Sequence, residues 1–293
     1  MKKLLGLLFG ILFVLILSVN SQVFADNIKF AQITDTHLSA ANPYTSRVLE
    51  SAIEDINKQF DISFVVFTGD NIANPKEADL TEFIKIVKKL NVPYYIVLGN
   101  SDVYKSNGLS KVRYFEMLKE ANLFKLNAQK SSNYVFKKNN FVFVLVDGAK
   151  EVVPGTVGYY RKDTLDWLDK VLTKYSKNDV VIFQHFPVVY PKEVESRLKT
   201  HKTYKVEDYL KVLSKHQNVL AVVSGHFHVN AETMENGVYH ISSPSLLTLP
   251  QEYKIIDIVT TKEFSPIIYT QLREFKVKKD ANSNSVDESE LSE

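Results

Sequence analysis

Apolar and polar positions alternate in a regular order through the first hundred residues after an apolar N-terminal segment. Runs rich in β-branched and aromatic residues, typical of buried strands, cover residues 28–35, 63–70 and 93–100. Between them, residues 46–60 and 77–90 carry apolar side chains at the spacing of an amphipathic helix. Strand–helix–strand units of this length predict parallel neighbouring strands joined by helical crossovers.

The second half of the chain mixes both kinds of strand pairing. Residues 132–148 predict a hairpin whose turn lies near Lys138-Asn139-Asn140. Residues 179–187 and 218–228 have the pattern of buried strands, with a polar loop and a helix between them. Further helices are expected at residues 111–123, 164–175 and 206–216, and further strands from there to about Glu274. We expect one domain over residues 26–275, because no Gly/Pro/Ser-rich linker interrupts it.

The N-terminus has the pattern of a secretory signal peptide over residues 1–25. Lys2 and Lys3 precede an uncharged apolar run of 16 residues, and Val23-Phe24-Ala25 provides a small-residue cleavage site. An uncleaved membrane anchor is the alternative, but a span needs about 20 apolar residues. The chain has no cysteine, so neither a lipidated cysteine nor a disulfide can form. An exported protein without disulfides fits a bacterial surface or secretion, with membrane contact only through the signal peptide.

Charge gives little attraction for nucleic acid. Cleavage after Ala25 removes two of the 36 basic residues and no acid, which leaves 34 basic and 34 acidic residues. Nucleic-acid binding depends largely on neutralised phosphates, so net neutrality and the lack of a basic aromatic segment disfavour a nuclease. At the other end, residues 276–293 form an acidic tail that is expected to be disordered.

Polar residues that bind metals follow each strong strand. Because ligands collect outside the carboxyl ends of such strands, we expect these side chains to converge. Residues i and i+2 of an extended backbone share a face, so the two-residue spacings within the first and last clusters predict paired ligands. Two aspartates, one asparagine and four histidines suit Mn, Fe, Zn or Ni. The clusters are Asp35-Thr36-His37, Gly69-Asp70, Gly99-Asn100, Gln184-His185 and Gly225-His226-Phe227-His228.

Each cluster also has a purely structural explanation. Asp35 before a threonine is suited to capping, Gly69-Asp70 is an ordinary turn dipeptide, and a lone His185 is more often a hydrogen-bonded core residue. All five clusters stand in order at strand ends, and this coincidence favours a metal site.

The constellation resembles the calcineurin-like metallophosphoesterase superfamily. The superfamily pattern is Asp-x-His, Gly-Asp, Gly-Asn-His-Asp/Glu, a later His and Gly-His-x-His, and the match spans residues 28–228. The resemblance implies an α/β fold of four layers, with two mixed β-sheets flanked by helices and two metal ions at strand carboxyl ends. It implies Mn, Fe or Zn as divalent or trivalent ions. By position, the first ion would be held by Asp35, His37, Asp70 and His228, and the second by Asp70 as a bridge with Asn100, His185 and His226.

The implied function is phosphoester hydrolysis by a metal-bridging hydroxide. Purple acid phosphatases have a tyrosine where Ala73 stands and lack the histidine that stands here as His37, so the resemblance is to the phosphodiesterase branch. Either phosphodiesters or phosphomonoesters, as small molecules or on the cell surface, fit this prediction. Neither the substrate nor the oligomeric state follows from the sequence. A binding module with weakened catalysis on the same fold is the alternative, and retention of all seven ligands favours the enzyme.

One position departs from the superfamily pattern. Ser101 stands where the superfamily has a histidine that, oriented by the following acid, protonates the leaving oxygen. Asp102 keeps the orienting position, but a serine hydroxyl is too weak an acid for this role near neutral pH. His201 could substitute if the polar loop folds over the metals, although a solvated loop histidine is the favoured interpretation.

Overall fold

The predicted strand–helix–strand units form the first of two β-sheets. The computed structural model describes residues 27–121, 131–260 and 265–279. The first sheet has the order β11-β10-β1-β2-β3, with parallel pairing among β1, β2 and β3 and antiparallel pairing of β10 and β11. Its strands are β1 (Asn27–Ile33), β2 (Val65–Thr68), β3 (Tyr94–Val97), β10 (Glu252–Val259) and β11 (Ile267–Glu274).

The second sheet begins with the predicted hairpin. Its order is β4-β5-β6-β7-β9-β8, in which β5, β6, β7 and β9 are parallel neighbours and both edge strands are antiparallel. The strands are β4 (Tyr134–Lys138), β5 (Phe141–Leu145), β6 (Asp179–Phe183), β7 (Val219–Ser224), β8 (Ala231–Glu235) and β9 (Val238–Ser242). The hairpin turn lies at Asn139-Asn140, as predicted.

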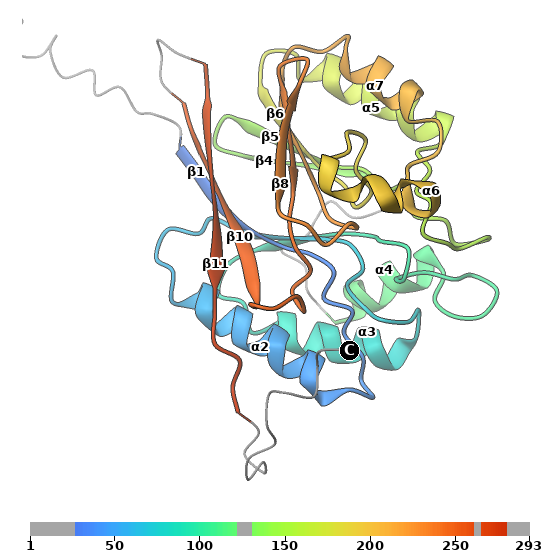
Figure 1. Cartoon of the computed structure of the whole chain (residues 1–293), viewed down its shortest axis with the longest axis vertical. Coiled ribbons are helices and arrows are strands. Elements are labelled where there is room, and N and C mark those ends of the chain that lie inside the picture. The colour runs from blue at the N-terminus through green and yellow to red at the C-terminus, as the bar shows by residue number, and fades with distance from the viewer. Residues whose placement is uncertain (1–26, 122–130, 261–264, 280–293) are drawn as a thin grey trace, which may run out of the picture.

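Helices cover the outer faces of both sheets, which gives the expected four layers (Figure 1). The first sheet carries α2 (Pro43–Asn57), α3 (Glu77–Val87) and α4 (Lys111–Glu120), and the second carries α5 (Lys162–Lys174) and α7 (Val206–Leu213). Alternate strand residues face opposite layers, as in Phe30 toward the other sheet and Ala31 toward the helices.

Aromatic side chains fill the space between the two sheets. Phe30 stacks on Phe64 with ring centroids 4.8 Å apart, and Phe143 stacks on Phe183 at 5.7 Å. All four rings are fully buried. This core joins the two sheets, so that loops from strands of both sheets meet at one edge.

The structure corrects two details of the predicted elements. The expected polar loop after residue 187 contains a 3₁₀ helix, η1 (Lys192–Arg197), and a short helix, α6 (Leu198–His201). The next helix ends at Leu213, so His216 lies beyond it and contacts Asp169 through Nε2 at 2.6 Å. Among the described residues, no helix has the length and hydropathy needed to span a membrane. The signal peptide over residues 1–25 and the tail from Asp280 fall outside the described residues and stay predictions.

Candidate metal centre

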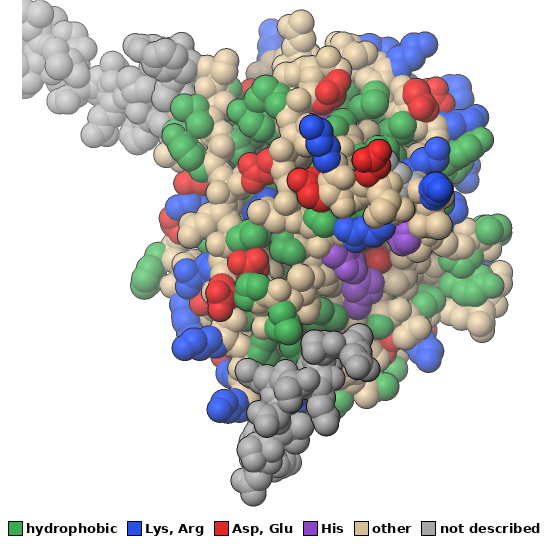
Figure 2. All heavy atoms as spheres, viewed as in Figure 1, with side chains coloured by type: hydrophobic (Ala, Val, Ile, Leu, Met, Phe, Trp, Pro, Cys, Tyr) green, Lys and Arg blue, Asp and Glu red, His purple; other side chains and the backbone are tan. Residues whose placement is uncertain are grey.

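Five of the seven predicted ligands form close groups in the structure, and the His226 ring, which is in neither group, has its centroid 5.0 Å from that of His185. The described His, Asp and Glu side chains form two groups that could hold a metal ion, and both groups include Asp35. Its Oδ1 lies 3.2 Å from His228 Nε2 and 4.0 Å from His185 Nε2. Figure 2 shows histidine side chains gathered on one face of the molecule. The groups are Asp35, His37 and His228, and Asp35, Asp70 and His185.

Asp70 reaches both groups with its two carboxylate oxygens. Oδ2 lies 3.9 Å from His37 Nε2, and Oδ1 lies 3.6 Å from His185 Nε2. Asn100 donates from Nδ2 to Asp70 Oδ2 at 3.1 Å, which places the amide beside the carboxylate. Each oxygen of Asp70 therefore faces a different group, an arrangement that suits a bridging ligand.

The ligands do not lie on extended backbone, contrary to the expectation from their two-residue spacing. β1 ends at Ile33 and β7 at Ser224, before the first ligand of each motif. Five of the seven predicted ligands have a positive φ, a region that costs about 1–3 kcal/mol for residues other than glycine. The five residues with this left-handed backbone conformation are Asp35, His37, Asp70, His226 and His228.

Hydrogen bonds set the orientation of two buried imidazoles. His185 Nδ1 lies 2.8 Å from the Thr68 carbonyl, and His226 Nε2 lies 3.0 Å from the His201 carbonyl. Since a carbonyl only accepts, these nitrogens carry the protons. The other ring nitrogens, His185 Nε2 and His226 Nδ1, are therefore the ones available to a metal ion. Outer-shell bonds of this kind are those that orient metal-binding histidines.

Among the buried side-chain atoms of the described residues that have no hydrogen-bond partner, three belong to predicted ligands. They are Asp35 Oδ1, Asn100 Oδ1 and His185 Nε2. The second oxygen of Asp35, by contrast, accepts from the His226 N–H at 3.0 Å and from the Thr34 hydroxyl at 2.7 Å. Leaving a buried acceptor unsatisfied costs about 1–3 kcal/mol. The donor set therefore fits metal ions, which these oxygen and nitrogen atoms would coordinate.

Burial and mutual charge shift the pKa values of the ligands. Burial opposes ionisation of Asp35, but the His185, His228 and His37 rings hold its pKa well below its ordinary value. Burial, together with the His185 charge, lowers the pKa of His226 to about 3, which keeps it neutral. Burial opposes protonation of His228, but Asp35 raises the pKa of this ring while the Arg197 cation opposes that rise.

Two glycines allow the loops to approach the aspartates. A Cβ at Gly99 would lie 2.1 Å from Asp70 Oδ1, and a Cβ at Gly225 would lie 2.6 Å from Asp35 Oδ2. No side-chain carbon fits at such distances, so glycine is required at both positions.

Gly99→Ala should weaken metal binding at least tenfold, because the new methyl group displaces Asp70. Gly237 offers a matched control, since a Cβ there meets nothing within 4 Å although its φ is +81°. We expect Gly237→Ala to lose about 1–3 kcal/mol of stability from backbone strain and Gly99→Ala to lose more, because its Cβ would also lie 2.2 Å from the Asp70 backbone nitrogen. Only Gly99→Ala should lose metal in elemental analysis. Equal metal content in the two variants would rule out this role for Gly99.

Ser101 and Asp102 serve the loop rather than a proton transfer. The Ser101 hydroxyl donates to the Ile72 carbonyl at 2.8 Å, and its N–H donates to Asp70 Oδ1 at 2.8 Å. Both oxygens of Asp102 are engaged by four N–H groups, those of Asn71 (backbone and side chain), Ile72 and Gly99. Burial and the charge of Asp70 raise the pKa of Asp102 to about 7. Asp102 is thus a positioning residue, with no acceptor site left to orient an imidazole at residue 101.

His201 lies closer to the centre than a solvated loop residue would. Its ring centroid is 5.4 Å from that of His226, and its carbonyl accepts the proton of that ring. The sequence pattern did not single out Thr34, Thr68 or Asn71, whose hydrogen bonds hold Asp35, His185 and Asp102. Only their positions beside the ligands could have pointed to them.

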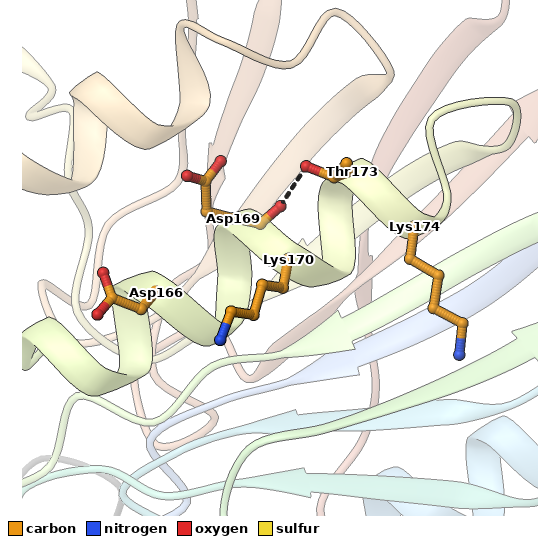
Figure 3. A pocket seen from close by; sticks show the side chains of 5 residues that line it. All are labelled: Asp166, Asp169, Lys170, Thr173 and Lys174. Atoms are coloured by element: carbon orange, nitrogen blue, oxygen red, sulfur yellow. Dashed lines mark hydrogen bonds between the residues drawn. The ribbon is translucent and has the colours of Figure 1, made fainter.

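A separate surface hollow on α5 has a different character. Figure 3 shows its lining side chains, all from one helix, with Thr173 bonded to the Asp169 carbonyl at 2.8 Å. Asp169 also pairs with Lys215 at 2.7 Å. The hollow of about 440 Å³ shares no residue with the metal centre.

Solved structures resemble this fold at low sequence identity. A dimetal phosphatase from Danio rerio aligns with a TM-score of 0.63 and 19% identity over 82% of this chain and 98% of its own. A putative 5′-nucleotidase from Staphylococcus aureus aligns with a TM-score of 0.57 and 15% identity over 90% of this chain and 56% of its own. These likenesses establish the fold.

Curated relatives extend the similarity to bacterial phosphodiesterases. A probable glycerophosphodiester phosphodiesterase of Arcobacter nitrofigilis is 26% identical over 221 residues, 73% of this chain and 77% of that protein. A 3′,5′-cyclic-nucleotide phosphodiesterase of a Nostoc species is 25% identical over 228 residues, 74% of this chain and 78% of that protein. The model of the calcineurin-like phosphoesterase family matches residues 28–230. With that match over most of its length, the chain belongs to the calcineurin-like phosphoesterase family and is a metallophosphoesterase.

Proposed function

We propose that this metallophosphoesterase is exported and hydrolyses small phosphodiesters. The observation that carries the proposal is that Asp35 Oδ1, Asn100 Oδ1 and His185 Nε2, three buried atoms without a hydrogen-bond partner, all belong to predicted ligands, so that bound cations would satisfy them. A decayed binding module would have no need to keep such a costly arrangement. The relatives named as phosphodiesterases support the preference for diesters.

The proposed division of the ligands between two ions follows the superfamily pattern, and it is supported by the close group of Asp35, His37 and His228 and by the contacts of Asp70 with both His37 and His185. Asp35, His37 and His228 would hold one ion, and His185, Asn100 and His226 the other, with Asp70 between them. When bound, the two ions would supply Lewis acidity toward phosphoryl oxygens and a water of lowered pKa. The chain itself contributes the imidazoles of His185 and His226, oriented by the Thr68 and His201 carbonyls, and the Asp35 carboxylate, whose pKa the neighbouring histidines lower.

A screen of phosphate monoesters and diesters with added Mn²⁺ tests the proposal. We expect turnover of bis(4-nitrophenyl) phosphate at a higher kcat/KM than 4-nitrophenyl phosphate, because the relatives are phosphodiesterases. A higher kcat/KM for the monoester would mean that phosphomonoesters, and not phosphodiesters, are the substrate class. No turnover of either ester, with two metal equivalents bound, would favour a binding module.

Export is a separate prediction, motivated by Lys2, Lys3 and the apolar run up to Val19. We expect N-terminal sequencing of the secreted protein to start at Asp26, because the Val-x-Ala site precedes it. Recovery of an intact N-terminus in the membrane fraction would indicate an anchor instead.

A further inference from the structure

The segment that follows β6 lies over the turn between the last two predicted ligands. It contains η1 and α6, and in Figure 2 Lys and Arg side chains border the histidines on the side where α6 lies in Figure 1. Three hydrogen bonds hold this segment in place. His226 Nε2 donates to the His201 carbonyl at 3.0 Å, and Thr203 Oγ1 donates to the Pro187 carbonyl at 2.7 Å. The Tyr204 N–H donates to the Gly158 carbonyl at 2.8 Å. The segment is therefore a fixed wall of the site.

The positively charged side chain of Arg197, at the end of η1, contacts the turn at residues 226–228. Its Nη1 donates to the Phe227 carbonyl at 2.6 Å, and its Cζ lies 5.9 Å from the Phe227 ring centroid. Phe227 stands between His226 and His228 in the sequence, so the guanidinium binds the backbone of the turn that carries both ligands, and its charge acts on His228. The side chain is half-buried, which restricts how water can screen its charge.

Arg197 has spare donors and no counter-ion. Within residues 27–121, 131–260 and 265–279, no carboxylate forms an ion pair with it, whereas Arg113, Arg161 and Arg273 each have one. A guanidinium has five N–H donors, and its one described hydrogen bond uses one of them. The half-buried Arg197 guanidinium therefore has N–H donors available to bind an anion beside the metal centre.

We propose that Arg197 binds the non-bridging oxygens of the substrate's phosphoryl group from the His226–His228 side of the centre. The planar guanidinium fork matches phosphate oxygens, and such clamps stabilise the charge that develops on a transferring phosphoryl group. This inference rests on the proposed function for its substrate. It assigns Arg197 a contact with substrate, beyond its bond to the Phe227 carbonyl.

Inorganic phosphate is the probe, and the protein is the full chain loaded with Mn²⁺. Calorimetry measures phosphate affinity, elemental analysis measures metal content, and kinetics measures kcat/KM for bis(4-nitrophenyl) phosphate. Arg197→Ala should weaken phosphate binding at least tenfold and lower kcat/KM by about 10²–10³, the usual cost of one transition-state donor. Arg197→Lys keeps a charge and a donor for the Phe227 carbonyl but loses the fork, so it should fall between Arg197→Ala and the native protein. Lys199→Ala, which removes an exposed cation from α6, should change each value less than twofold.

The outcomes separate a substrate contact from a structural role. If Arg197→Ala or Arg197→Lys loses metal while phosphate affinity per metal-loaded site stays native, Arg197 only holds the turn and the inference is overturned. Native phosphate affinity and kcat/KM in Arg197→Ala overturn it as well. If the native protein turns over no phosphoester but still binds phosphate in an Arg197-dependent way, the proposed function fails and the anion site stands.

Discussion

Asp70→Ala is expected to lose both metal ions and all measurable phosphoesterase turnover. Its Oδ2 faces His37 at 3.9 Å and its Oδ1 faces His185 at 3.6 Å, so one side chain serves both groups. Loss of an outer-shell partner costs about 10–100-fold in metal affinity, and a shared direct ligand should cost more. Elemental analysis of the purified variant after dialysis measures the loss.

Two further variants serve as controls for the metal loss expected of Asp70→Ala. Asp79 is also a buried aspartate, but its Oδ1 accepts from the Ala40 N–H at 2.8 Å, so Asp79→Ala should keep both ions. Asn100→Ala should mainly weaken one ion, because the superfamily pattern assigns Asn100 to one ion whereas Asp70 is shared. Two full metal equivalents in a folded Asp70→Ala protein would show that Asp70 is not the bridge.

The rate should fall steeply as the pKa of the leaving group rises. Ser101 cannot give a proton to the leaving oxygen, and its hydroxyl already donates to the Ile72 carbonyl at 2.8 Å. General acid catalysis contributes about 10²–10⁴-fold, so alkyl esters should be slower than aryl esters by at least that factor. A series of aryl and alkyl phosphodiesters, plotted as log kcat/KM against leaving-group pKa, gives the slope.

Ser101→Ala is the matched variant for this prediction. It removes one hydrogen bond, which should cost about 1 kcal/mol of stability, and it should leave the slope unchanged. A shallow slope in the native enzyme would mean that another group donates the proton. His201, whose ring lies 5.4 Å from His226, is then the candidate, and His201→Ala rather than Ser101→Ala would steepen the slope.

The strands, the helices between them and the ligand positions could be predicted because they depend on local patterns, whereas the four layers followed from the resemblance to the superfamily. Hydrophobic periodicity identified β1 to β3 and the helices between them, and polar residues directly after each strand identified the candidate ligands. The conformation of those ligands could not be predicted in the same way. Asp35 and His37 were expected to share a face of an extended strand, but β1 ends at Ile33 and both residues have positive φ. Bonds to another loop, such as the Asp35 N–H to the Gly69 carbonyl at 3.0 Å, fix these turns.

The wall of the site depends on contacts that no sequence pattern encodes. Residues 192–201 have no helical periodicity, and η1 and α6 are too short to show one. Their place follows from buried Val194 and from single hydrogen bonds to distant residues, such as that of Arg197 to the Phe227 carbonyl. The role of Asp102 was likewise hidden, since its four donors come from two different loops.

Titration of the metal-free protein with Mn²⁺ tests the central claim most directly. Binding and turnover of bis(4-nitrophenyl) phosphate are measured in the same samples, after removal of metal by chelation. We predict no turnover without metal and a rise that reaches its plateau at two equivalents, because Asp70 lies between two groups of ligands. Full turnover in the metal-free protein, or none at two bound equivalents, would contradict the assignment of this centre as a dinuclear phosphoesterase site.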